Sequence, residues 1–142
     1  MILLDVNVVV YAVRREFEHH RIARSWLAQT LVSDEPVGVL DEVLCATVRL
    51  LTNRRVVRTP LTIEQATRLC DQVRAAPAAV VPASSPKRWE RFTGIVTGLG
   101  LRGNDVPDAF LAATALDLRA GVATFDRGFH RFPGLRVVRP GD

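Results

Sequence analysis

The chain has 142 residues and is poor in the residues that mark several classes of protein. Its two cysteines, Cys45 and Cys70, lie in apolar helical patterns without C-x-x-C spacing, which excludes a disulfide scaffold and a zinc ribbon. No uncharged apolar run reaches the roughly 18 residues of a membrane span. Met1 leads into Ile2–Leu4 with no basic segment, so no signal peptide is visible. We therefore expect a soluble protein of the reducing cytoplasm, with both cysteines as small core residues.

Lysine is almost absent, because Lys87 is the only one among 19 basic residues. The 15 acidic residues leave a net charge of +4, and this excess falls in residues 72–142, which hold ten basic and six acidic side chains. Arginine binds phosphate oxygens through paired hydrogen bonds, so an arginine-rich surface suits a nucleic acid. A GC-rich genome that replaces lysine with arginine throughout explains the ratio equally well.

Nothing in the sequence divides the chain, which has no repeats, no low-complexity tracts and no evident linker. At this length we expect one domain over residues 1–142. Apolar runs predict strands at 2–4, 37–40, 79–81, 122–125 and 135–138, and local propensity favours a strand over a short helix at 6–13. Helices are predicted at 18–31, 41–51, 62–75, from Ser85 onward, and at 106–120 with Gly121 as the stop. This alternation predicts an α/β domain with a mainly parallel central sheet.

Apolar residues recur in the predicted helices at the spacing of one buried face. The residues expected to face the core are Ile22, Trp26, Leu27, Leu31, Trp89, Phe92, Ile95 and Val96. For the two tryptophans, core packing or a dimer face is favoured over base stacking. The three histidines have no mutual metal spacing and are expected at the surface.

Four acidic residues stand where strands end or helices begin. Asp5 and Asp126 directly follow predicted strands, whereas Glu42 and Asp108 lie at predicted helix starts. In parallel α/β units, strand C-termini and helix N-termini face the same edge, so these four side chains are expected to converge. The alternative for Glu42 and Asp108 is a helix cap or a partner of the helix dipole.

Carboxylates gathered in one cleft repel each other unless a cation joins them. Oxygen-rich clusters suit Mg²⁺ or Mn²⁺, and such a site can activate water for attack on a phosphodiester. A basic surface around an acidic pocket is what a metal-dependent nuclease needs. The sequence therefore favours that class, and no Gly-rich phosphate loop follows the first strand to support a small-molecule α/β enzyme.

The acids lie in segments that match a known family over nearly the whole chain. The matching segments are residues 3–8 around Asp5, 41–44 and 48–56 after Glu42, 103–113 around Asp108, and 123–135 around Asp126. Together they resemble the motifs of PIN-domain ribonucleases and, within that group, of VapC toxins from bacterial toxin–antitoxin pairs. In this resemblance the second acid is Glu42 and not Asp41.

The resemblance implies a three-layer α/β/α fold and RNA cleavage that depends on Mg²⁺ or Mn²⁺. It also implies a homodimer and a cognate VapB-type antitoxin as partner. We expect the antitoxin to block the acidic cleft with an arginine. The catalytic and metal-binding residues would be Asp5, Glu42, Asp108 and Asp126. The alternative is a non-catalytic RNA- or protein-binding module that retains the fold.

Some positions depart from the family pattern or support the four acids. Gly128 stands where the family often has a fifth carboxylate. Asp105 either supplies that missing charge or faces solvent before the helix. Asn7 and Thr124 are expected to orient a metal-bound water, although a buried strand threonine is the simpler interpretation of Thr124.

Four arginines follow the second acid with no acidic residue among them. These are Arg49, Arg54, Arg55 and Arg58. Because arginine is frequent at phosphate contacts, they form a candidate RNA-backbone track, and the alternative is a solvated helix end and loop.

Overall fold

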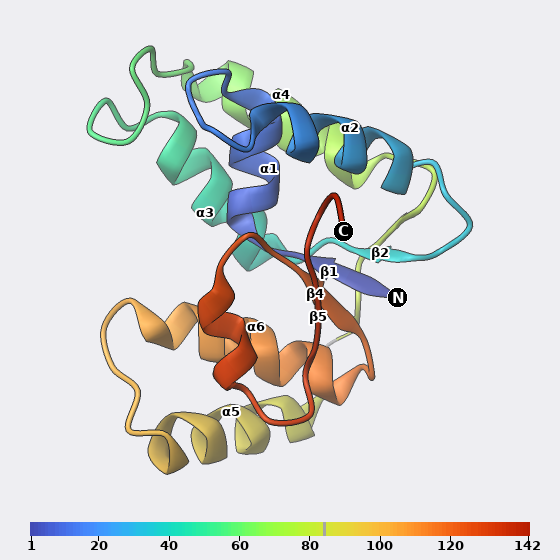
Figure 1. Ribbon diagram of the computed structural model, residues 1–142, viewed down its shortest axis with the longest axis vertical. Coiled ribbons are helices and arrows are strands. Elements are labelled where there is room, and N and C mark those ends of the chain that lie inside the picture. The colour runs from blue at the N-terminus through green and yellow to red at the C-terminus, as the bar shows by residue number, and fades with distance from the viewer. Residues whose placement is uncertain (84) are drawn as a thin grey trace.

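The computed structural model describes residues 1–83 and 85–142 and is built on a sheet of five parallel strands in the order β3-β2-β1-β4-β5 (Figure 1). The strands are β1 (Ile2–Leu4), β2 (Val37–Gly38), β3 (Ala79–Val80), β4 (Gly121–Ala123) and β5 (Arg136–Val138). The chain passes from β1 to β2 and β3 on one side and then returns to add β4 and β5 on the other. Its order therefore reverses between β1 and β4, where ligands bind in open α/β sheets.

The helices cover both faces of this sheet. On one side lie α1 (Val6–Val13), α2 (His20–Thr30), α3 (Asp41–Leu51) and α4 (Ile63–Arg74), and on the other lie α5 (Pro86–Gly98) and α6 (Asp105–Asp117) (Figure 1). A short 3₁₀ helix, η1 (Arg127–Arg131), follows β4. The arrangement confirms the α/β/α class and the parallel sheet. Within the described residues, no helix is long and apolar enough to cross a membrane.

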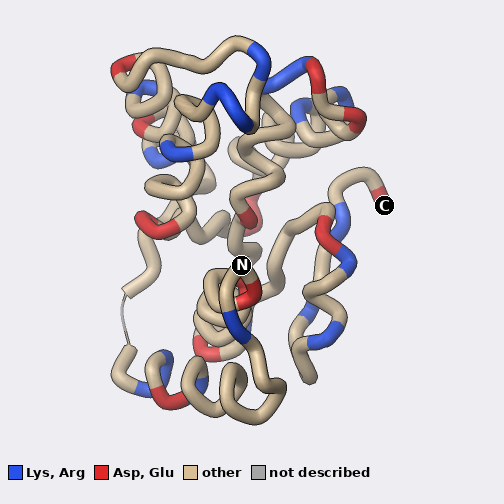
Figure 2. The backbone as a smooth tube through the Cα atoms, turned by 90° about the vertical axis from the view of Figure 1, so that its left-hand side faces the viewer, with Lys and Arg blue, Asp and Glu red and all other residues tan. Residues whose placement is uncertain are grey.

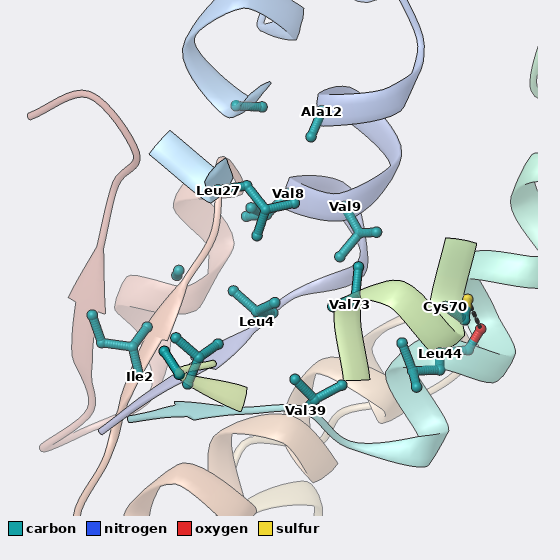
Figure 3. Close-up of a cluster of buried hydrophobic side chains, with 14 of the residues drawn as sticks. Ile2, Leu4, Val8, Val9, Ala12, Leu27, Val39, Leu44, Cys70 and Val73 are labelled. Carbon is teal, nitrogen blue, oxygen red and sulfur yellow. Dashed lines mark hydrogen bonds between the residues drawn. The ribbon is translucent and has the colours of Figure 1, made fainter. Parts of the chain in front are cut away.

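Alternation along β1 divides the core into two layers. Ile2 and Leu4 pack in the cluster under α1, α2 and α4 (Figure 3), whereas Leu3 packs in the cluster under α5 and α6. Because β1 is buried on both faces, all three of its residues are apolar, as central strands of parallel sheets require. Asp5 therefore follows a strand that is packed on both faces.

The segment Val6–Val13 is a helix, so the preference for a strand was wrong. Helix propensities differ by only a few tenths of a kcal/mol among these residues, whereas α1 buries Val8, Val9 and Val10. Burial therefore outweighs local propensity. The turn into α1 begins directly at Asp5, which brings Asn7 back beside that residue.

The structure confirms two predicted helix starts and contradicts one predicted stop. Thr62 and Gln65 form the expected capping box of α4, and Ser85 with Pro86 opens α5. Gly121 is not the stop of α6, because α6 ends at Asp117 and Gly121 begins β4. A Cβ at Gly121 would lie 2.9 Å from Nε of Arg136, so the residue serves close packing between strands.

Three residues expected in the core are exposed. Trp89 keeps 64% of its surface and Ile22 keeps 47%, and Cys45 is also exposed. On α5, Phe92 packs toward the core, whereas Trp89, one turn earlier, is left exposed. Cys70 is buried as expected, and Trp26 packs against the first cluster.

Candidate active site

Asp5 is the most buried acid of the molecule, with 6% of its surface exposed. Its Oδ2 accepts hydrogen bonds from Nδ2 of Asn7 at 2.5 Å and from the hydroxyl of Thr124 at 2.6 Å. Burial raises the pKa of Asp5 above its usual value, and the nearby charge of Asp126 raises it further, although the bond from Thr124 opposes this. Both side-chain donors are neutral, so they fix the carboxylate without cancelling its charge.

Asn7 and Thr124 tie the end of β1 to the end of β4. The hydroxyl of Thr124 accepts the Asp126 N–H at 2.9 Å, and Oδ1 of Asn7 accepts the Phe125 N–H at 3.1 Å. These bonds set the amide orientation of Asn7 and the backbone position of Asp126. In this structure both residues act directly on the acids, whereas their expected action on a bound water stays a prediction.

Asp108 lies in the first turn of α6 and feels the other acids. Burial, followed by the charges of Asp5 and Asp126, raises its pKa to about 6. The same two charges raise the pKa of Tyr11 beyond the effect of burial. Three of the four predicted acids therefore share one negative field at the ends of β1 and β4.

Glu42 joins this group through a cleft and not through a direct contact. A cleft of about 450 Å³ is lined by the carboxylates Asp5, Glu42 and Asp108. The neighbouring Asp41 points elsewhere and pairs with Arg74 at 2.6 Å. The structure thus brings Glu42, rather than Asp41, to the cleft.

Arg131 is a member of the site that sequence reasoning missed. Its guanidinium contacts Oδ1 of Asp105 at 3.0 Å and Oδ2 of Asp108 at 3.2 Å. Asp105 and Asp108 are one helical turn apart, so a single planar guanidinium spans both. Asp105 is therefore engaged by an arginine, while 44% of its side-chain surface stays exposed to solvent. The sequence feature that could have indicated this role is the position of Arg131 in the segment that follows the fourth acid, Asp126.

Asp126 is held by its own turn. Its Oδ1 accepts the Gly128 N–H at 2.7 Å and so caps η1. A Cβ at Gly128 would lie 3.0 Å from that oxygen, which leaves little room for a side chain. The departure at Gly128 thus accompanies a close turn around the fourth acid.

The donor set fits a hard divalent cation, since all four groups are carboxylates and Asp5 is buried with neutral donors only. Within residues 1–83 and 85–142, however, no three His, Cys, Asp or Glu side chains already form a metal-binding group. The charge of Asp126 contributes to the raised pKa of both Asp5 and Asp108, but the acids remain apart. A cation would have to draw them together.

The model of the PIN domain family matches residues 2–135. This chain belongs to the PIN-domain family. Among curated PIN relatives, ribonuclease VapC43 of Mycobacterium tuberculosis is 39% identical over 142 residues, which are all of this chain and 97% of the relative. Ribonuclease VapC25 of the same species is 32% identical over 140 residues, 99% of each chain. The chain therefore groups with the VapC branch of the family.

Solved PIN structures share its fold. The crystal structure of M. tuberculosis VapC20, described as a sarcin-ricin loop cleaving toxin, gives a TM-score of 0.69 at 19% identity and covers 96% of this chain and 99% of that one. VapBC-1 of nontypeable Haemophilus influenzae gives 0.69 at 17% identity, with all of both chains covered. At these identities the likeness establishes the fold.

The predicted arginine track lies on and beyond α3 of this PIN domain. Arg49, Arg54, Arg55 and Arg58 are all exposed. Because Glu42 lies in the first turn of α3 and the last three arginines follow its end, the track runs away from the cleft by about 16 Å, the length of the helix. Basic positions elsewhere occur in both helical layers and near the C-terminal strand (Figure 2).

Proposed function

We propose that this protein is a metal-dependent endoribonuclease toxin of a VapBC-type system, which hydrolyses RNA phosphodiester bonds with Mg²⁺ or Mn²⁺. The observation that carries the proposal is the gathering of Asp5, Asp108 and Asp126 in one negative field, where burial and then repulsion by the charges of Asp5 and Asp126 raise the pKa of Asp108 to about 6. Such repulsion is the condition under which carboxylates bind a cation. Full-length similarity to proteins named VapC ribonucleases supports the reaction class.

The metal would be held by Asp5, Glu42, Asp108 and Asp126. A divalent cation bound there supplies a more acidic water and stabilises negative charge on the phosphate. The chain's own residues prepare the ligands. Thr124 and Asn7 orient Asp5 through its Oδ2, and the Gly128 N–H orients Asp126.

The decisive experiment replaces the buried acid. Asp5→Asn keeps the size of the side chain and can still accept the Thr124 hydroxyl, so we expect a folded protein that has lost at least about 100-fold of its RNA cleavage in Mg²⁺. Mn²⁺ binding measured by calorimetry should weaken in parallel. The matched control is Asp71→Asn on the exposed face of α4, which should change neither quantity.

The same experiment addresses the alternative of a non-catalytic module. If Asp5→Asn protein cleaves RNA as fast as the parent, the assignment of the acids as catalytic ligands is wrong. If the parent binds RNA but never cleaves it, the protein is a binding module that retains the fold.

We also propose a VapB-type antitoxin as partner, a homodimer as the functional assembly and the cytoplasm as location. Several structurally similar proteins were crystallised as VapBC complexes, including that of Rickettsia felis. An arginine from the partner would complement the acidic cleft. Purification from the native operon should yield a small second chain, and light scattering should give twice the monomer mass.

A further inference from the structure

The cleft beside the acids is mostly apolar. Besides the three carboxylates, its walls are apolar side chains, most of them from α3, α5 and α6, among them Val43, Trp89, Phe92 and Phe110. Three of the four acids of the proposed nuclease thus line a cavity whose other walls are apolar. Metal binding and water activation use the carboxylates, so the apolar walls are free to bind another part of the substrate.

Trp89 stands at this cleft as an exposed aromatic residue. Of the large apolar side chains recorded as exposed in the described chain, it is the only aromatic one, at 64%. Its ring centroid lies 5.3 Å from that of Phe92, which lies 5.5 Å from that of Phe110. The three rings form a continuous aromatic wall along the cleft.

We propose that this cleft binds a nucleobase of the RNA substrate, with Trp89 stacking on the base next to the phosphodiester that is cut. The inference rests on the proposed ribonuclease function. An RNA strand whose phosphate reaches Asp5 and Asp108 carries its neighbouring bases past the same cavity. Single-stranded RNA is recognised by bases that leave the stack and lie against aromatic rings.

A cation stands at the cleft beside the aromatic wall. Arg131 contacts Oδ2 of Asp108, a residue of the cleft lining, at 3.2 Å, and 32% of its side-chain surface is exposed. It can meet a backbone phosphate while Trp89 offers a flat apolar face to the neighbouring base. An apolar peptide segment is the competing occupant, and it would have no use for this cation.

Fluorescence can test the stacking directly, because the chain has only two tryptophans. In a Trp26→Phe background, Trp89 is the sole indole. A pool of short single-stranded RNA of random sequence, added in EDTA, should quench its fluorescence, and an abasic strand of the same length should not. Equal quenching by both strands would overturn the proposal.

Substitution gives a second measurement. Trp89→Ala should raise the Kd for the RNA pool and the KM of cleavage roughly tenfold or more with little change in kcat, and Trp89→Phe should restore part of the loss. Leu99→Ala, an exposed apolar residue at the end of the same helix, is the control and should behave as the parent.

The outcomes separate this inference from the proposed function. If the parent cleaves RNA and Trp89→Ala leaves Kd and KM unchanged, only the base site is wrong. If that variant instead loses binding to a co-purified partner chain, the cleft docks a protein. If the parent neither binds nor cleaves RNA, both the base site and the ribonuclease assignment fail.

Discussion

The ionisation of Asp108 makes the free energy of unfolding depend on pH. Its pKa is raised from 3.8 to about 6 by burial and by the charges of Asp5 and Asp126. Between these two pH values, Asp108 of the metal-free folded protein therefore still holds a proton that it has released in the unfolded chain. This contribution to stability is complete below about pH 4 and is lost as the pH rises through about 6.

Replacement of Asp108 should remove that dependence. We expect the free energy of unfolding of the parent, relative to Asp108→Asn, to fall by up to about 3 kcal/mol between pH 4 and pH 7, because one pKa unit corresponds to about 1.4 kcal/mol. Urea denaturation in EDTA at a series of pH values measures the difference. A difference that is flat with pH would mean that folding does not raise the pKa of Asp108.

The position of Asp5 could be predicted from the sequence because this residue directly follows β1, and that of Asp126 because it follows the strand predicted at 122–125, although β4 itself ends at Ala123. Arg131 could not, since its two partners lie more than 20 residues away and are reached only when η1 docks on the start of α6. Asn7 was recognised as relevant, but its contact with Asp5 depends on α1 beginning at once after β1. Local sequence patterns do not reveal the contacts between helices and strands that build the site.

At the scale of elements, β2 is only two residues long and lies directly against β1. A Cβ at Gly38 would collide with the side chain of Leu3, so glycine is what allows the two strands to approach. Gly38→Ala should therefore destabilise the protein by about 1–3 kcal/mol, the usual cost of overpacking a core. It should also disturb the approach to Glu42, which follows β2.

Gly94→Ala is the matched control for that substitution. Gly94 lies inside α5, and a Cβ there would meet nothing within 4 Å. Alanine favours a helix interior over glycine by about 0.5–1 kcal/mol, so this variant should be more stable than the parent. Denaturant midpoints that shift in the same direction for both variants would contradict the packing argument.

At the scale of the whole molecule, five strands could be predicted as short apolar runs, but their order could not. Val6–Val13 shows why the patterns mislead, since burial against the sheet decides its conformation and local propensity does not. Trp89 shows the converse, because its helical spacing predicts burial while no neighbouring element of the described chain covers more than a part of it. Both errors concern how much surface a neighbouring element covers.

The charge of the molecule gives a final prediction for RNA binding. Arg54 and Arg55 are exposed beyond the end of α3, with the acids at its start. If the strand continues from the cleft along this helix, the double variant Arg54→Ala/Arg55→Ala should weaken binding without altering kcat. The slope of log K against log salt should become shallower by about 1.4, since each single-strand phosphate contact contributes about 0.7.

Arg136→Ala provides the control, because Arg136 begins β5 and contacts the backbone of Met1 and the carboxylate of Glu35, at the sheet edge opposite the acids. Its removal lowers the net charge by one but takes no cation from the proposed path. The change in slope, divided by the number of arginines removed, can be compared between the two variants. If it is equal, RNA binding depends on net charge alone and no track exists. A change confined to the Arg54/Arg55 variant would place the RNA backbone along α3, from Glu42 in its first turn to the two arginines beyond its end.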